Sequence, residues 1–160
     1  MIKIAVGSDR RGFSYKIEVI QYLTEHGCEV VDVGPYDGMV PVDYPIYGEK
    51  VGKLVSSGKC RYGVAICATG TGIMISANKV RGIRCGIAYT DDAVRLMREH
   101  NDANVIAFGQ SQMSLDDVFR RLDIFLRTDF LGDYHVSRVQ QIQNIENGIP
   151  ISQTPVNKIF

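Results

Sequence analysis

The stretch Ala65-Ile66-Cys67-Ala68-Thr69-Gly70-Thr71-Gly72-Ile73 joins an apolar run to a glycine-rich turn and then to a helical pattern. The run Gly63 to Ile66 is apolar throughout, which is typical of a buried parallel strand covered on both faces. Gly70 and Gly72 allow a tight turn, whose backbone N–H groups can face an anion at the start of a helix. Open α/β sheets bind ligands where their strands end, so Cys67 is the first candidate for chemistry. A cysteine in this place is also a common small core residue, and that alternative stays open here.

Outward from this stretch, strands and helices alternate along the chain. The apolar patterns predict strands at 2–6, 29–33, 63–66, 84–88 and 104–108, and helices at 13–26, 44–57, after the glycine turn, and at 90–100, 114–126 and 134–147. In the first helix we expect Phe13, Ile17 and Ile20 to share the buried face. The alternation predicts a three-layer α/β/α Rossmann-like sandwich with a five-stranded parallel sheet. We expect one domain over 1–148, followed by an extended arm over 149–160 that lies on a neighbouring subunit.

Composition excludes several classes of protein. The 18 basic and 18 acidic side chains balance and are not clustered, so no broad basic surface is available for nucleic acid. No apolar stretch is long enough to span a membrane or to act as a signal segment, so we expect a cytoplasmic protein with four free thiols. No cysteine or histidine spacing indicates a metal site. The turn 7–12 lacks the dinucleotide-binding glycine spacing, and Asp32 is expected inside its strand, so a nucleotide cofactor is not predicted.

Polar groups follow several of the predicted strands. In a parallel sheet, Asp9 and Arg10 can meet Cys67 and Thr69 across one crevice. His100 lies between a helix end and a buried strand, and we expect it at the same edge, where it can move protons near pH 7. A thiolate can remove a proton next to a carbonyl while aligned N–H groups stabilise the enediolate oxygen. The alternative for His100 is a helix-terminal residue favoured by the helix dipole.

From Met1 to about Glu146 the chain resembles the type B ribose-5-phosphate isomerases and the related galactose-6-phosphate isomerase subunits. The resemblance is carried by six motifs in family order: Ile4-Ala5-Val6-Gly7-Ser8-Asp9, Asp43-Tyr44-Pro45, Cys67-Ala68-Thr69-Gly70-Thr71-Gly72-Ile73, Ala77-Asn78-Lys79, Gly82-Ile83-Arg84 and His100-Asn101-Asp102-Ala103-Asn104-Val105. Together these motifs are specific, although none of them would suffice singly.

The resemblance implies an aldose–ketose isomerase that needs no metal and no organic cofactor. It implies that Cys67 moves a proton between C2 and C1 of a sugar phosphate, and that His100 opens the sugar ring with help from Asp9. It further implies a homodimer or homotetramer with sites between subunits, to which Arg138 contributes from the partner chain. The remaining substrate-binding residues that it indicates are Tyr44, Thr69, Gly70, Thr71, Gly72, Asn101 and His135.

The chain also departs from the family pattern around the expected phosphate. Arg10 stands where the family usually has histidine, no arginine follows Phe108-Gly109, and Tyr134 stands where an arginine commonly precedes His135. We expect Arg10 to bind the phosphate through its forked guanidinium, the alternative being a solvent-facing side chain beside Arg11. Three functions stay open: isomerisation of ribose 5-phosphate, isomerisation of another phosphosugar such as galactose 6-phosphate or allose 6-phosphate, and sugar-phosphate binding without catalysis.

Overall fold

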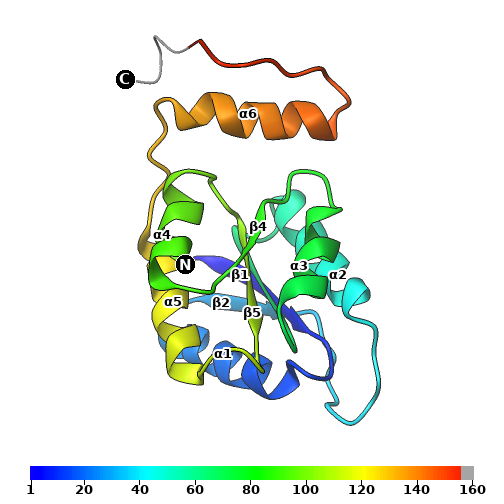
Figure 1. Ribbon diagram of the computed structural model, residues 1–160. Coiled ribbons are helices and arrows are strands. Elements are labelled where there is room, and N and C mark those ends of the chain that lie inside the picture. The colour runs from blue at the N-terminus through cyan, green and yellow to red at the C-terminus, as the bar shows by residue number, and fades with distance from the viewer. Residues whose placement is uncertain (156–160) are drawn as a thin grey trace.

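A computed structural model describes residues 1–155 of the chain. Within this range strands and helices alternate as the sequence predicts, and each lies within a few residues of its expected position (Figure 1). The elements are β1 (Lys3–Ser8), α1 (Phe13–Glu25), β2 (Glu29–Asp32), α2 (Tyr44–Ser56), β3 (Tyr62–Cys67), α3 (Thr71–Asn78), β4 (Cys85–Ile87), α4 (Asp91–Glu99), β5 (Val105–Gly109), α5 (Leu115–Arg127) and α6 (His135–Glu146).

The strands form one parallel sheet in the order β2-β1-β3-β5-β4. α1, α4 and α5 cover one face of the sheet, and α2 and α3 cover the other. This arrangement confirms the predicted three-layer α/β/α sandwich with a five-stranded parallel sheet. None of the helices formed by residues 1–155 is both long and apolar enough to cross a membrane.

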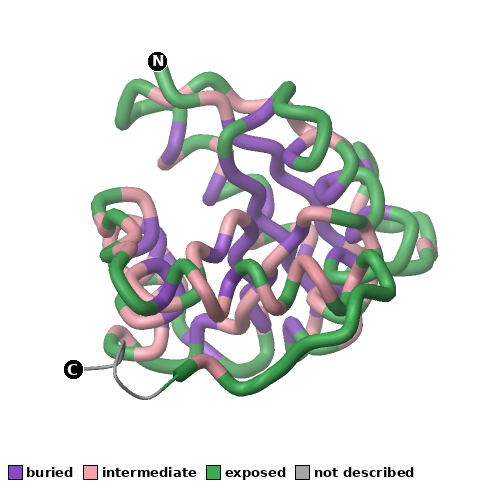
Figure 2. Tube along the Cα trace, turned by 90° about the horizontal axis from the view of Figure 1, so that it is seen from above, coloured by how far each residue is buried: buried purple, intermediate pink, exposed green. Residues whose placement is uncertain are grey.

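The central strand β3 is buried along its whole length, which explains its continuous apolar sequence. Ile66 faces the core under α1 and α5, whereas Ala65 and Cys67 face the core under α2 and α3. A Cβ added at Gly63 would lie 2.5 Å from Val51, so the missing side chain lets α2 approach the sheet closely. Figure 2 shows this buried interior enclosed by more exposed helix surfaces and loops.

Two predicted helix starts are formed by hydroxyl caps. The N–H of Ala93 donates to Thr90 Oγ1 at 3.1 Å, and the N–H of Asp117 donates to Ser114 Oγ at 3.2 Å. Each bond satisfies one of the N–H groups that the first turn of a helix leaves without a partner.

The buried face of α1 differs from the expected one. Lys16 is completely buried, whereas Ile17 is 45% exposed. The Lys16 ammonium lies 2.8 Å from both carboxylate oxygens of Asp32 and 2.6 Å from the carbonyl of Pro35. Asp32 is the last residue of β2, so it is available at the strand's end to receive this cation. Paired in this way, the lysine can occupy a core position that its charge alone would forbid.

The chain leaves β1 and β3 toward opposite faces of the sheet. α1 follows β1 on one face, and α3 follows β3 on the other, although the two strands are neighbours in the sheet. A topological switch point of this kind opens a crevice outside the carboxyl ends of the two strands. The loop that begins with Asp9 follows β1 and the loop that begins with Ala68 follows β3, so both loops start at these ends.

α6 stands apart from the three layers and runs across the end of the sheet at which β4 and β5 begin (Figure 1). Its first residue, His135, stacks on His100, and near its other end Glu146 accepts the N–H of Gly82 at 2.9 Å. Beyond α6, residues 149–155 run back along the same helix, where Gln141 donates to the carbonyl of Ser152. This part of the predicted arm therefore contacts its own chain, and residues 156–160 lie outside the described residues.

Candidate active site

Asp9 lies at the carboxyl end of β1 with its carboxyl group fixed by the loop that it begins. Its N–H donates to the carbonyl of Ile66 at 3.1 Å, and its Oδ1 accepts the N–H of Gly12 at 2.8 Å. A Cβ at Gly12 would lie 2.5 Å from the Ile66 carbonyl oxygen, so this turn requires glycine. Burial raises the pKa of Asp9, against a lowering by the N–H groups of Gly12 and Arg11. The carboxyl group therefore holds a proton at higher pH than an ordinary aspartate.

Cys67 ends β3 and is only 4% exposed. Its sulfur accepts a hydrogen bond from the N–H of Gly70 at 3.1 Å, which stabilises negative charge on the sulfur. Gly70 has a φ of +82° as it caps α3, a conformation that favours glycine. Within residues 1–155, no other cysteine sulfur accepts a backbone hydrogen bond. Burial raises the pKa of the thiols of Cys28, Cys60 and Cys85.

The glycine turn packs between the ring of Tyr44 and the end of the neighbouring strand β5. A Cβ at Gly72 would lie 2.8 Å from the ring of Tyr44, and a Cβ at Gly109 would lie 2.6 Å from the carbonyl of Thr69. Tyr44 and Cys67 therefore both lie beside the turn formed by Thr69, Gly70, Thr71 and Gly72. With Asp9 they form what we call the carboxyl-end cluster. Arg10 is exposed and borders an open hollow with Phe13, Tyr36 and Met39.

His100 does not join this cluster within one chain, which corrects the expectation that it shares an edge with Cys67. It caps the end of α4 and precedes β5, whose first residue, Val105, pairs with Gly63 at the start of β3. Cys67 pairs with Gly109 at the other end of the same two strands. Four residues of strand, about 13 Å, therefore separate the edge of the sheet near His100 from the edge near Cys67. Helices in such a sheet run back against the strands, so a residue at a helix's end belongs to the edge where strands begin.

His100 gathers instead with the other predicted residues of the C-terminal part. Its ring stacks on His135, with centroids 4.1 Å apart and planes 14° from parallel. The Arg138 Nη1 donates to the carbonyl of Tyr134 at 2.8 Å, one residue before His135. His135 is 6% exposed, whereas Asn101, which follows His100 in the sequence, is exposed. We call His100, Asn101, His135 and Arg138 the amino-end cluster.

The loop that presents His100 and Asn101 is held by a residue that sequence reasoning did not single out. Asp102 has a φ of +46°, and its carboxylate lies 2.9 Å from both Arg84 Nη2 and Arg98 Nη1. Arg84 Nε also donates to the carbonyl of Asn101 at 2.9 Å. Arg98 is 3% exposed, so its charge depends on this partner. The signal in the sequence was an aspartate beside the candidate His-Asn pair, with one arginine four residues before it.

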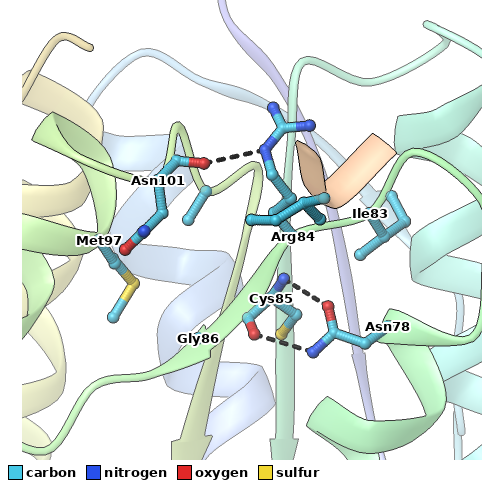
Figure 3. Close-up of a pocket in the computed structure, with 9 residues that line it drawn as sticks. Asn78, Ile83, Arg84, Cys85, Gly86, Met97 and Asn101 are labelled. Atoms are coloured by element: carbon cyan, nitrogen blue, oxygen red, sulfur yellow. Dashed lines mark hydrogen bonds between the residues drawn. The ribbon is translucent and has the colours of Figure 1, made fainter. Parts of the chain in front are cut away.

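A hollow of about 250 Å³ adjoins Asn101, between β4 and α6. Figure 3 shows Arg84 and Asn101 on one side of it and Cys85 with Asn78 on the other. The Asn78 side chain accepts the N–H of Cys85 at 2.7 Å and donates to its carbonyl at 2.9 Å. Ile83, Met97 and Ile142 make the lining largely apolar. No group of three His, Cys, Asp or Glu side chains in residues 1–155 is placed to hold a metal ion.

The fold is that of an α/β protein with a switch point between β1 and β3, the place where open α/β sheets bind ligands. The hydrogen-bonded thiol of Cys67, the half-buried carboxyl group of Asp9 and the glycine turn lie at this place. Comparison with known proteins assigns the family. Residues 4–142 match the model of the Ribose/Galactose Isomerase family. The chain therefore belongs to this family of sugar isomerases, and its class of enzyme is that of the aldose–ketose isomerases.

The match to individual relatives covers most of each protein's length. The chain is 40% identical over 146 residues to ribose-5-phosphate isomerase B of Escherichia coli, covering 91% of this chain and 97% of that protein. It is 36% identical to galactose-6-phosphate isomerase subunit LacB of Clostridium acetobutylicum, covering 79% of this chain and 73% of the relative. The solved structure of Clostridium thermocellum ribose-5-phosphate isomerase B has a TM-score of 0.90 at 42% identity, covering 92% of this chain and 99% of that one.

Proposed function

We propose that the protein interconverts ribose 5-phosphate and ribulose 5-phosphate by proton transfer at Cys67. The observation that carries the proposal is the thiol of Cys67 at the switch point, which receives the N–H of Gly70, with the half-buried carboxyl group of Asp9 at the end of the neighbouring strand β1. A thiolate here is a base beside oxyanion donors, which is what an enediolate reaction requires. The family model ends at residue 142, and we assign residues 1–148 to the isomerase domain and 149–160 to the arm.

The reaction begins on the open-chain aldose. The Cys67 sulfur takes the proton from C2, the C–H electron pair forms the C1–C2 double bond, and the carbonyl electrons move onto O1. The turn from Thr69 to Gly72 offers backbone N–H groups to the oxyanion. The Cys67 thiol then returns its proton to C1 while the proton of the C2 hydroxyl passes to O1, which gives the ketose and restores the thiolate. No atom is gained or lost, so the reaction needs no oxidant, reductant or cofactor.

The proposal places each site between two subunits. His100 is needed to open the sugar ring, yet within one chain it lies at the opposite end of the sheet from Cys67. A two-fold dimer resolves this separation when the amino-end cluster of one subunit faces the carboxyl-end cluster of the other. α6 is suited to reach across because Ile142 and Ile145 are 43% and 62% exposed beside Arg138. In the dimer Asn101 binds a substrate hydroxyl, and Arg138 binds the phosphate.

A second substrate is supported by a specific observation. One relative is a galactose-6-phosphate isomerase subunit, and the chain carries Arg10 and Tyr134 at positions where the family pattern differs. A hexose phosphate such as galactose 6-phosphate or allose 6-phosphate is therefore the alternative to ribose 5-phosphate. The third function, sugar-phosphate binding without catalysis, is disfavoured by membership of this family of aldose–ketose isomerases.

Two measurements decide among these functions. A coupled assay over pentose and hexose phosphates identifies the substrate by its kcat/KM, and we expect ribose 5-phosphate to be the best. Exchange of the substrate C2 proton with solvent is then compared between the wild type and Cys67→Ala. We expect the variant to lose exchange while retaining phosphate binding, with Cys85→Ala, a buried cysteine remote from the turn, as the matched control. Exchange at the wild-type rate in Cys67→Ala would assign the base to another residue.

A further inference from the structure

Four side chains form a continuous stack at the start of α6. The ring of His135 contacts both the ring of His100 and the ring of Tyr134, each with centroids 4.1 Å away. The guanidinium carbon of Arg138 lies 4.8 Å from the centroid of the Tyr134 ring. We call His100, His135, Tyr134 and Arg138 the stacked column. It joins the end of α4 to the first turn of α6.

We propose that Tyr134 and His135 are positioning residues. They hold the side chains of His100 and Arg138 in a fixed arrangement, from which both can reach a substrate bound at the partner subunit. The inference rests on the proposed function, because it takes His100 as the ring-opening group and Arg138 as the phosphate ligand. It also gives His135 a different role from the predicted substrate contact. With 6% of its surface exposed between two rings, His135 has little area left for a ligand.

The attachment of α6 makes this positioning necessary. α6 stands apart from the core, so its own packing does not fix where Arg138 points (Figure 1). At its far end, Glu146 is bound to Gly82 and Asn147 to Arg81, about three helical turns away from the column. The stacking of His135 on His100 therefore connects the first turn of α6 to the loop that presents His100 and Asn101. A shift of about 1 Å in such a group is enough to cost substantial rate.

Tyr134 fixes the guanidinium of Arg138 from two directions. The face of its ring attracts the cation, and its carbonyl accepts the Nη1 hydrogen at 2.8 Å. The guanidinium is thereby oriented before substrate arrives, so less side-chain freedom is lost when phosphate binds. Tyr134 itself is 40% exposed and remains accessible from the partner side.

The column requires a neutral His135. Burial, together with the nearby His100 and Arg138, lowers the pKa of His135, while Asp133 and Glu99 act in the opposite direction. These are the charged and titratable groups that face the ring from the end of α4 and the start of α6. A neutral imidazole stacks between its neighbours without repelling the Arg138 cation. Position and protonation thus favour the same arrangement.

The test compares variants that keep or remove the stacking surface. Tyr134→Leu should raise KM for the phosphosugar about five- to tenfold, whereas Tyr134→Phe, which keeps the ring face and the carbonyl, should stay within about twofold of the wild type. His135→Ala should lower kcat on the cyclic sugar about tenfold or more, and His135→Phe should recover most of that loss. Val136→Ala, at an exposed position of the same helix turn that is not in the column, controls for changes in α6 itself.

A second readout does not depend on the enzyme's substrate. In the wild type, the ring protons of His100 should show an upfield NMR shift from the ring of His135, and this shift should vanish in His135→Ala and persist in His135→Phe. Loss of the shift together with the kinetic effects supports the column. An unchanged His100 spectrum in folded His135→Ala, or equal KM values for Tyr134→Leu and wild type, would overturn it. If no phosphosugar is isomerised, the proposed function fails, while the NMR experiment still decides whether the column orients His100.

Discussion

Two inactive variants should restore activity when they share one dimer. Cys67→Ala removes the proton-transferring sulfur, and His100→Asn removes the ring-opening imidazole, so each homodimer should lose about 10²- to 10⁴-fold in rate. The two residues lie at opposite ends of paired strands, with about 13 Å of strand between their levels. Direct proton transfer requires contacts of about 3 Å, so one chain alone cannot use both residues on one sugar.

The arithmetic of a two-fold dimer fixes the size of the recovery. In a heterodimer of the two variants, one site carries both substitutions and the other carries none. The purified heterodimer should therefore have about half of the wild-type activity, and a random mixture about one quarter. Co-expression with two different tags followed by two affinity steps isolates the heterodimer, and the coupled isomerase assay measures its activity.

A matched heterodimer reverses the outcome. When one subunit carries both substitutions and the other is wild type, every shared site contains one defect, so the dimer should be inactive. A site built within one chain predicts the opposite for both dimers, with no activity for the paired single variants and about half for the double variant with wild type. That result would refute the shared site.

Arg10→His should raise KM for the phosphosugar at pH 7, and this increase should shrink as the pH falls and the new histidine becomes charged. A series of KM measurements from pH 6 to 8 tests this. KM values equal to those of the wild type throughout would place Arg10 in solvent. Asp102→Ala should destabilise the protein by about 2–3 kcal/mol in urea unfolding, because the 3% exposed Arg98 loses its carboxylate, while the 37% exposure of the Asp102 side chain limits the cost. Asp102→Asn should lose less, and equal stability of Asp102→Ala and wild type would show that the Arg98 charge is satisfied by other groups. The pKa of His135 is lowered from 6.5 in the folded protein. Its contribution to the stability of the folded state is therefore fully present above pH 6.5 and is lost as the pH falls through the folded-state pKa. Hydrogen exchange of the α6 amides, corrected for intrinsic rates, should therefore become faster on acidification in the wild type but not in His135→Phe. Equal protection of α6 in the wild type before and after acidification would contradict this linkage.

The fold could be predicted because each element carries its own local signal. The apolar run ending in Cys67, the glycine turn after it and the hydroxyl caps at Thr90 and Ser114 all act over a few residues, and the structure contains each of them. The buried face of α1 could not be predicted in the same way. Lys16 is buried because Asp32 and Pro35 meet its ammonium across a loop, a contact between distant residues that no helical period encodes.

The residues of the candidate site show the same difference between what local sequence signals place and what only the folded chain places. Asp9, Cys67 and the glycine turn were placed correctly because all of them follow strands, and the ends of parallel strands meet at one edge. His100 was placed wrongly because it ends a helix, and the return direction of that helix puts it at the other edge. The stacking of His135 on His100 involves residues far apart in sequence, so only the folded chain reveals it.

The bond pair between Asn78 and Cys85 limits how molecules of this protein can associate. β4 is an outer strand of the sheet, and its outward N–H and carbonyl at Cys85 are already occupied by one side-chain amide. A strand from another molecule would have to displace both bonds before it could pair with Cys85, so growth of the sheet from molecule to molecule is opposed at this position of the edge. A variant that lacks the Asn78 amide would expose both groups of Cys85, and it should therefore precipitate more readily during expression.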